Sequence, residues 1–207
     1  MFPLINLGQV IDLGTADSFM LYSCNGAVYN TGVSTITGDI GSDVGAVSGF
    51  GTSTVNGSFY NADAVTAQVK IDVINAYNQL FSTPATVTSH APAFGSGETL
   101  STGIYTIAGA GSIAGNLTLD GARDTCSLFI FRFAGAFTTG AASSITLING
   151  AQACNILWVS EGASSLAAST IMKGTVLANN AAVSAAIGSR IEGRMLSKTE
   201  QLLLIRQ

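Results

Sequence analysis

Past residue 98 the sequence repeats a cycle of three short runs, and this repeat constrains the fold more than any other feature. The first run of each cycle is almost continuously apolar or uncharged, at residues 103–107, 128–131, 156–159, 175–178 and 194–197. Two further runs follow, each with one large apolar residue among small ones, and the cycle recurs about every 18 to 29 residues. Three runs per cycle are typical of a three-sided parallel β-solenoid, in which each coil packs on its neighbours.

The three sides of this solenoid, named side one, side two and side three after the runs, differ in their chemistry. Side one reads as continuous apolar sequence, so we expect it to be covered on both faces, as buried parallel strands are. Sides two and three alternate, so one face of each meets solvent. The large residues expected to point inward are Ile113, Phe137, Leu166 and Val183 on side two, and Leu117, Ile145, Ile171 and Ile191 on side three.

The outward positions separate side two from side three. On side two they hold only Ala, Ser and Thr, at Ser112, Ala114, Ala136, Thr138, Ser165, Ala167, Ala182 and Ser184. On side three they end in long and charged residues, at Asn116, Thr118, Ser144, Thr146, Thr170, Met172, Arg190 and Glu192. Side two is therefore expected to be flat and uncharged.

One stretch, residues 61–81, has helical periodicity. Its apolar residues recur at three- and four-residue steps, at Val65, Val69, Val73, Ala76 and Leu80. Asn61 or Asp63 caps its start and Pro84 ends it. We expect this helix to cover side one. The predicted contacts join Val65, Val69, Val73 and Leu80 of the helix to Phe129, Phe131, Leu157 and Val176 of side one.

The N-terminal part contains a detached copy of the cycle. Residues 19–22, 27–29 and 35–37 resemble sides one, two and three, and the Gly-rich segment 38–60 is expected to be a loop or cap. The predicted organisation is a single domain over residues 1–207, mainly β. It consists of an N-terminal coil (1–37), the cap (38–60), the helix (61–81) and stacked coils (99–207).

Composition excludes several classes of protein. Only 10% of the residues are charged, against about 25% in a typical soluble domain. The eight basic residues are scattered, so nucleic-acid binding is not expected, and no apolar run reaches the roughly 20 residues of a membrane span. No signal-peptide pattern opens the sequence, which indicates either a mature secreted chain behind an added methionine or a cytosolic protein.

The residues that usually carry catalysis or bind metals are dispersed. The nearest carboxylate pairs, Asp39 with Asp43 and Asp120 with Asp124, lie in Gly-rich turns and are interpreted as turn structure. The only histidine, His90, is expected to be a solvated loop residue. We therefore expect neither an enzyme nor a metal or other cofactor.

The cysteines and large aromatic residues are assigned to structure. Cys126 and Cys154 precede side-one runs by the same offset, so either a bridge between them or a buried thiol at Cys154 is expected. Cys24 is expected to be a buried thiol. Trp158 and Phe131 lie on the covered side and are expected in the core, not on a sugar-binding surface.

Several ordered motifs resemble the DUF3494-type ice-binding proteins of cold-living bacteria, fungi and algae. The N-terminal motifs are Leu13-Gly14-Thr15-Ala16 with Phe19, Asn30-Thr31-Gly32, residues 36–41 (ITGDIG) and residues 47–50 (VSGF). The later motifs are residues 76–78 (AYN), 103–105 (GIY), 117–120 (LTLD), 129–131 (FIF) and 148–155 (INGAQACN), then Trp158 and Gly193-Arg194. Together they cover nearly the whole chain.

The resemblance implies a right-handed, discontinuous β-helix with a long helix along one side. It also implies that the N-terminal coil docks beside the C-terminal coil, with Ala27 and Tyr29 next to Ala182 and Ser184. Secretion and binding to ice, with antifreeze activity, are implied as well. Of the family's Thr-Ala/Gly-x-Thr/Asn pattern, residues 31–34 (TGVS) and 139–142 (TGAA) keep only the first half.

Side two is the expected ice-binding face. The predicted site comprises Ala27, Tyr29, Thr31, Ser112, Ala114, Ala136, Thr138, Ser165, Ala167, Ala182 and Ser184. The expected partner is the ice crystal surface, bound by a monomer, with no nucleic acid and no membrane involved. The alternative is a secreted adhesin or carbohydrate-binding module on the same scaffold, which Tyr29 favours because sugar sites usually expose aromatic residues.

Overall fold

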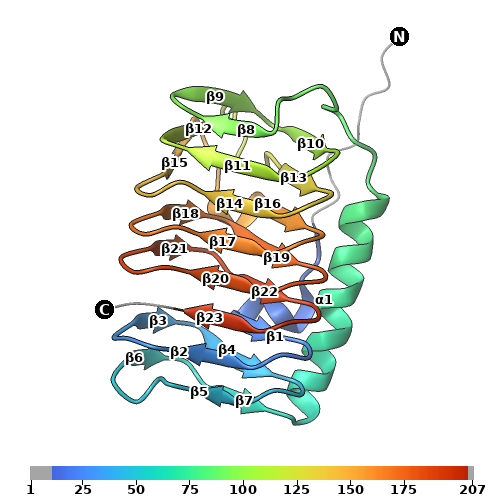
Figure 1. Cartoon of the computed structure of the whole chain (residues 1–207). Coiled ribbons are helices and arrows are strands. Elements are labelled where there is room, and N and C mark those ends of the chain that lie inside the picture. The colour runs from blue at the N-terminus through green and yellow to red at the C-terminus, as the bar shows by residue number, and fades with distance from the viewer. Residues whose placement is uncertain (1–10, 205–207) are drawn as a thin grey trace.

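The three runs of each cycle lie on three different sides of a stack of coils (Figure 1), in a computed structural model that describes residues 11–204. Side one is an eight-stranded sheet in the order β10 (Gly103–Ile107), β13 (Phe129–Phe133), β16 (Ile156–Ser160), β19 (Thr175–Ala178), β22 (Met195–Ser197), β1 (Phe19–Ser23), β4 (Asp39–Ser42) and β7 (Phe59–Asn61). Strands of neighbouring coils pair in parallel, as predicted for a solenoid.

Side two is also eight-stranded, whereas side three is divided. Side two has the order β5 (Val47–Ser48), β2 (Val28–Asn30), β23 (Leu202–Leu204), β20 (Val183–Ala185), β17 (Ser164–Leu166), β14 (Phe137–Thr139), β11 (Gly111–Ala114) and β8 (Ala93–Gly95). Side three has five strands, β21 (Arg190–Glu192), β18 (Ile171–Lys173), β15 (Ser144–Ile148), β12 (Asn116–Asp120) and β9 (Glu98–Ser101), and a separate pair, β3 (Thr35–Thr37) and β6 (Thr54–Asn56). The helical elements are α1 (Ala64–Ser82) and two 3₁₀ turns, η1 (Gly14–Ser18) and η2 (Ala153–Asn155).

The chain runs discontinuously through the stack. Its N-terminal coils lie at one end, α1 runs along side one, and the coils from β8 onward lead back toward the N-terminal ones (Figure 1). On side one the two parts pair directly, with Leu21 level with Met195. On side two β23 lies between them, because Leu203 is level with both Ser184 and Tyr29. The expectation that Ala27 and Tyr29 lie next to Ala182 and Ser184 is therefore wrong.

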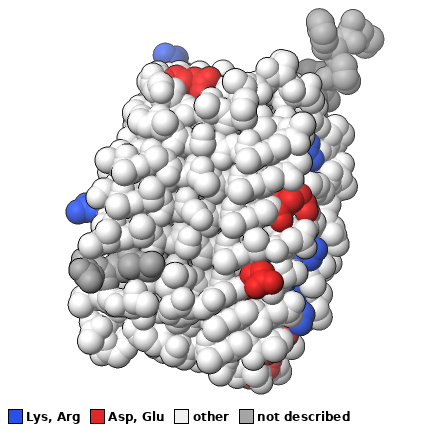
Figure 2. Space-filling model, viewed as in Figure 1, with Lys and Arg blue, Asp and Glu red and all other residues white. Residues whose placement is uncertain are grey.

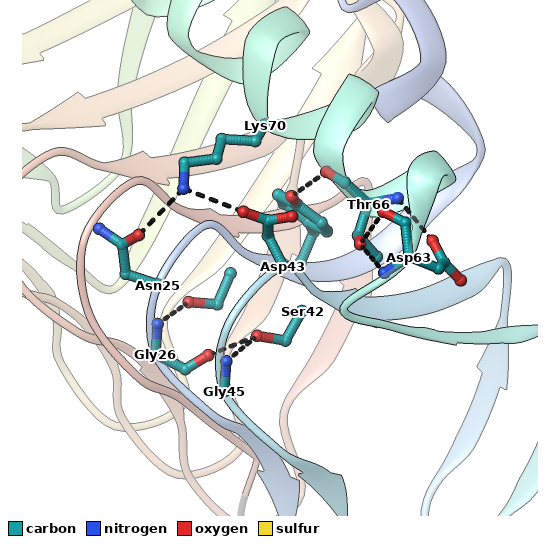
Figure 3. A network of polar contacts seen from close by, with 10 residues as sticks. Asn25, Gly26, Ser42, Asp43, Gly45, Asp63, Thr66 and Lys70 are labelled. Carbon is teal, nitrogen blue, oxygen red and sulfur yellow. Dashed lines mark hydrogen bonds and ion pairs between the residues drawn. The ribbon is translucent and has the colours of Figure 1, made fainter.

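The Gly-rich segment 38–60 is not a loop. It contains β4, β5 and β6 and the start of β7, which form one more coil at the end of the stack. Its glycines lie at tight corners. A Cβ atom on Gly45 would clash with the neighbouring coil, because it would lie 2.4 Å from the backbone nitrogen of Ala27. At this corner the Ser42 hydroxyl accepts a hydrogen bond from Gly45 N (2.9 Å) and donates one to the Gly26 oxygen (2.8 Å; Figure 3). Glycine thus marks close approach of coils here.

The stacked coils also begin earlier than the predicted residue 99, because β8 and the first residue of β9, Glu98, precede it.

Helix α1 begins at a capping box and ends before Pro84, as predicted. The Asp63 carboxylate accepts a hydrogen bond from Thr66 N, and the Thr66 hydroxyl accepts one from Asp63 N, both 2.9 Å (Figure 3). The Tyr22 hydroxyl donates to the buried Thr66 carbonyl oxygen (2.6 Å). These contacts turn Thr66 inward and leave Val65 41% exposed, so the prediction that Val65 packs on side one is wrong.

The helix packs on the expected side through partly different residues. Val69, Val73, Ala76, Tyr77 and Leu80 are buried. They contact the outward residues of side one, which include Ile104, Ile130, Leu157, Val159, Leu177 and Leu196. Leu157 belongs to the same apolar cluster as Val69, Val73 and Leu80, in agreement with the prediction. Phe129, Phe131 and Val176 instead belong to the solenoid interior, because a strand buried on both faces carries no polar residue to mark which side chains point inward.

Stacked aromatic rings fill the interior. Register places Tyr105, Phe131 and Trp158 level with one another. The ring centroids are 5.0 Å apart for Tyr105 and Phe131 and 4.1 Å apart for Phe131 and Trp158. Trp158 and Phe131 are fully buried, which confirms their assignment to the core.

On side three the predicted register fails in one coil. Ile171 is 42% exposed, while Thr170 and Met172 are buried. The Thr170 hydroxyl is satisfied inside, because it donates to the Ala167 oxygen (2.7 Å) and lies 2.8 Å from the Thr139 hydroxyl. Because Thr170 points inward and its hydroxyl is hydrogen-bonded there, the alternation of inward and outward side chains is shifted by one residue in this coil.

Candidate functional site

A column of small side chains runs down the outer surface of side two. Strand register places the outward residues at the middle of each strand level with one another. From β8 to β5 they are Ala93, Ser112, Thr138, Ser165, Ser184, Leu203, Tyr29 and Ser48. The four successive coils of β11, β14, β17 and β20 thus present a hydroxyl at the same position. Because neighbouring strands in a sheet lie about 4.8 Å apart, these hydroxyls repeat at about that spacing.

Alanines flank this hydroxyl column on both sides. Two residues before it lie Ala136, Ala163, Ala182, Ala27 and Ala46, whose carbonyls accept backbone hydrogen bonds from the adjacent coil. Two residues after it lie Ala114, Gly140, Ala167, Ala186 and Thr31. All eleven residues predicted for the site are therefore on the solvent side of one sheet, and each is exposed or half-buried.

Several residues of this surface were not predicted from the sequence. Ala93, Ala163, Ala186, Ser48 and Leu203 occupy equivalent positions. The alternation of Leu202, Leu203 and Leu204, with the first and third buried, was the signal that would have found β23.

Buried hydroxyls brace the edge of this surface. The Ser143 hydroxyl donates to the Gly140 oxygen (2.7 Å), and the Ser189 hydroxyl donates to the Ala167 oxygen (3.1 Å). The Thr139 hydroxyl accepts a hydrogen bond from Ala167 N (2.9 Å). Because successive corners are joined in this way, the outward positions are held in place by the neighbouring coils.

Side two carries no charge over its central strands. Figure 2, viewed as Figure 1, shows the surface over β11, β14, β17 and β20 without Lys, Arg, Asp or Glu, and charged atoms lie at its margins. Side three, in contrast, bears the Lys173–Glu192 ion pair and Arg190.

The surface is interrupted near β23. A shallow hollow of about 370 Å³ is lined by Thr138, Ser165, Ala167, Ser184, Ala186 and Leu203. Leu203 and Tyr29 are larger than the Ser and Thr of the same column, so they form a step between the two parts of the solenoid. The hollow extends over β14, β17 and β20, so the flatness expected from the sequence is not kept over these strands.

Of the two carboxylate pairs, Asp120 and Asp124 form turns, as predicted. Asp120 accepts hydrogen bonds from Ala122 N (2.8 Å) and Asn149 Nδ2 (2.9 Å), which hold the pKa of its carboxyl below the usual value. Asp124 accepts one from Cys126 N (2.8 Å).

Asp39, in the other pair, instead lies on strand β4 and accepts a hydrogen bond from Ser58 N of the next coil (2.9 Å), so its assignment to a turn is wrong. Asp43 forms an ion pair with Lys70 of α1 (2.9 Å; Figure 3). Within residues 11–204, no group of three His, Cys, Asp or Glu side chains is arranged to hold a metal ion.

His90 is not a solvated residue. Its side chain is 14% exposed, with Nε2 2.8 Å from Glu98 Oε1 and Nδ1 2.6 Å from the Ala91 oxygen. Its ring stacks on Phe94 with centroids 4.2 Å apart. His90 therefore closes the β8 end of the solenoid, a role that requires Glu98 and Phe94 from the following strands.

The cysteines differ from expectation in two of three positions. Cys24 is a buried free thiol, as predicted, and burial raises its pKa to about 12. Cys126 and Cys154 are free and exposed, so neither the bridge nor the buried Cys154 thiol is found. The exposed turns around them explain the difference.

In the described part of the chain, no helix is long and apolar enough to cross a membrane.

Comparison with known proteins assigns the family. A family model described as "Ice-binding-like" matches residues 23–207. The chain belongs to this family. It is 35% identical over 167 residues to an ice-binding protein of Nostoc sp. (strain HG1), covering 80% of this chain and 61% of that protein. It is 30% identical over 210 residues to an ice-binding protein of Flavobacterium frigoris (strain PS1), covering 93% of this chain and 74% of the relative.

Solved structures of family members share the fold. An ice-binding protein from an Antarctic Flavobacteriaceae bacterium superimposes with a TM-score of 0.92 at 41% identity, covering 96% of this chain and 47% of that chain. One from the Antarctic ascomycete Antarctomyces psychrotrophicus gives a TM-score of 0.90 at 32% identity, covering 95% and 97%. The chain thus spans about half of the first of these proteins and nearly all of the second, and its predicted β-helix with one helix alongside is confirmed.

Proposed function

We propose that this protein is an antifreeze protein that adsorbs to ice through side two. The observation that carries the proposal is the uncharged column of Ser112, Thr138, Ser165 and Ser184, held in register by parallel strands and flanked by alanines. Its membership of the ice-binding-like family supports the same activity.

The spacing of the column suits ice. Parallel strands repeat about every 4.8 Å, and alternate outward residues of one strand lie about 6.5–7 Å apart, both near oxygen spacings in hexagonal ice. The alanine methyl groups leave adjacent water to hydrogen-bond to itself, while the hydroxyls of the column anchor that water layer. Side two thereby presents ordered water to the crystal.

The rigidity of side two lowers the cost of adsorption. Its small side chains have few rotamers to lose, and buried hydroxyls such as those of Ser143 and Thr139 brace the corners. Many weak contacts are therefore made at once with little ordering of the protein. The proposed activities are thermal hysteresis and inhibition of ice recrystallisation.

The proposal includes a monomeric, non-enzymatic protein that acts outside the cell, where it meets growing ice. Activity in the culture medium of the source organism, together with a monomer mass in sedimentation, checks these points. The adhesin or sugar-binding alternative is not favoured, because the matching family model and relatives are ice-binding proteins, although Tyr29 lies on the outer surface of side two.

Bulk placed on side two tests the proposal. Thr138→Tyr and Ala167→Tyr each add a ring at the middle of the surface, which holds the ice plane away from several coils. Thermal hysteresis and recrystallisation inhibition are expected to collapse. Both positions face outward, so the free energy of unfolding is expected to change by no more than about 0.5 kcal/mol.

Thr146→Tyr is the matched control. Thr146 is exposed, as Thr138 is, and lies on β15 of side three. This variant is expected to retain full activity. Loss of activity in Thr146→Tyr together with full activity in Ala167→Tyr would move the ice contact to side three, and an inactive wild type would refute ice binding.

A further inference from the structure

The strand ladder of side two stops at one point on the proposed ice-binding surface. The pairing of β14 with β17 ends at the pair Thr138–Ser165. The pairing of β17 with β20 continues one residue further, to the pair Leu166–Ala185. The next residue of the β17 coil is Ala167, which lies two residues after Ser165 of the hydroxyl column. The ladder between β14 and β17 therefore ends before it reaches Ala167.

A side chain takes the place of the backbone partner of Ala167. The equivalent groups of two neighbouring coils, Gly140 N and Ala186 N, each donate a hydrogen bond to a backbone carbonyl oxygen of the preceding coil (both 2.8 Å). Ala167 N instead donates to the side-chain hydroxyl of Thr139 (2.9 Å). A hydroxyl oxygen thus holds the β17 coil at the point where a backbone oxygen holds the other two coils.

Two buried threonines form a closed chain of hydrogen bonds around Ala167. The Thr170 hydroxyl donates its proton to the Ala167 oxygen (2.7 Å), so the proton between the Thr139 and Thr170 hydroxyls (2.8 Å) comes from Thr139. The Ser189 hydroxyl also donates to the Ala167 oxygen (3.1 Å). Buried hydroxyls therefore hold both the amide and the carbonyl group of Ala167.

We infer that Thr139 is a positioning residue of side two, whose buried hydroxyl sets where Ala167 lies relative to Gly140 and Ala186 of the neighbouring coils. The inference rests on the proposed function of side two as an ice-binding surface. Thr139 is level with Ile113, whose apolar side chain leaves the position of the next coil to backbone hydrogen bonds. The hydroxyl of Thr139 takes over this role for the β17 coil.

The position of Ala167 affects adsorption because several coils contact the crystal at once. Thr139 is itself only 8% exposed, and it lines the same shallow hollow as Ala167. Its effect on ice binding therefore passes through Ala167. Because adsorption sums many weak contacts, a displaced Ala167 keeps adjoining coils from reaching the crystal at the same time.

Amide hydrogen exchange, measured by NMR residue by residue, tests the positioning role without any ice assay. Thr139→Val keeps the size of the side chain but removes the acceptor of the Ala167 amide. Exchange at Ala167 is expected to become at least about fivefold faster, because one hydrogen bond is lost. The amides of Gly140 and Ala186 are internal controls, since they donate to backbone oxygens and should keep their wild-type exchange rates.

Thermal hysteresis tests the consequence for ice binding. The value for Thr139→Val is expected to fall below about half of the wild-type value, while Thr139→Ser, which keeps the hydroxyl, should remain fully active. Thr66→Val is the matched control, because Thr66 is also a buried threonine with a hydrogen-bonded hydroxyl but lies on α1. It should lower the melting temperature and leave thermal hysteresis unchanged. Circular dichroism at the assay temperature checks that each variant is folded.

Unchanged exchange at Ala167 in Thr139→Val would overturn the inference, and so would wild-type thermal hysteresis in this variant or lost activity in Thr139→Ser. An equal loss of thermal hysteresis in Thr66→Val would also overturn it, because the loss would then follow from lower stability alone. An inactive wild-type protein would refute the proposed function itself, and with it the role of Thr139. Should Thr139→Val fail to fold, Thr170→Val, which removes the side-chain donor to the Ala167 oxygen, is expected to lower thermal hysteresis in the same way.

Discussion

At the scale of single residues, Arg132 joins side one to the end of the helix. It lies on β13 and is buried, which lowers its pKa from the usual value. Its Nη1 donates hydrogen bonds to the carbonyl oxygens of Leu80 (3.0 Å), Phe81 (3.2 Å) and Thr83 (2.8 Å), and its Nε and Nη2 donate to Thr106 Oγ1. The last carbonyls of a helix have no partner within it, so the guanidinium acts as its C-terminal cap.

Replacing Arg132 tests this cap. Arg132→Met keeps much of the buried stem but leaves the carbonyls at the helix end without a donor. We expect the free energy of unfolding to fall by about 2–4 kcal/mol, measured by chemical denaturation. Arg123→Met, at an exposed turn, is the control and should have almost no effect. An equal loss in both variants would contradict the capping role.

The three thiols should differ sharply in reactivity. Cys24 is buried and its pKa of about 12 keeps it protonated at pH 8, whereas Cys126 and Cys154 are exposed. A thiol-specific chromogenic reagent at pH 8 is therefore expected to label two thiols rapidly in the native protein and the third only after denaturation. Rapid labelling of all three thiols would show that Cys24 is accessible, and no rapid labelling would indicate a bridge.

At the scale of elements, a carboxylate joins η1 to α1. Asp72 on α1 accepts hydrogen bonds from Thr15 N (2.8 Å), Thr15 Oγ1 (2.6 Å) and Gln68 Nε2 (2.9 Å). Partial burial alone would raise the pKa of Asp72, but these hydrogen bonds outweigh it and lower the pKa below the usual value. The ionised form is therefore the one that fastens η1.

The lowered pKa of Asp72 predicts that its contribution to the stability of the folded protein is lost in acid. Because the folded pKa lies below the unfolded value of about 3.9, the stabilisation is present above that value and is lost as the pH falls through the folded pKa. Asp72→Asn should lower the melting temperature at pH 7 and bring it close to that of the wild type at pH 2. A constant difference between the two proteins from pH 7 to pH 2 would contradict the role of the charge.

At the scale of the whole molecule, the step formed by Leu203 and Tyr29 divides the proposed ice-binding surface. These residues continue the column of Ser184 across the junction but are much larger. The double variant Leu203→Thr, Tyr29→Thr extends the hydroxyl column from β20 toward Ser48. If side two binds ice, thermal hysteresis should rise, because more coils contact the crystal at once.

A side-three substitution provides the comparison. Ile148→Thr also removes an exposed apolar side chain, but from β15. It should leave thermal hysteresis unchanged. Unchanged or lower activity in the double variant, with its melting temperature preserved, would show that the contact is confined to the coils on the β20 side of the step.

Local periodicity alone predicted much of this protein. The spacing of Val69, Val73 and Leu80 determined the helix and its covered side, and the alternation around Phe137 and Leu166 determined which side chains of side two face outward. These properties depend on neighbours in the chain, since a strand has a period of two and a helix a period of 3.6. The uncharged composition of side two follows from the same alternation.

Only the tertiary structure decided how the parts meet. Phe131 points inward and Leu157 outward because the helix covers one face of a strand that is apolar on both, which the sequence does not mark. The insertion of β23 between β20 and β2 depends on pairing between residues more than 150 positions apart, such as Tyr29 and Leu203. Backbone hydrogen bonds pair any two strands that reach the same edge, so the order of strands at this junction is set by the space that the folded coils leave.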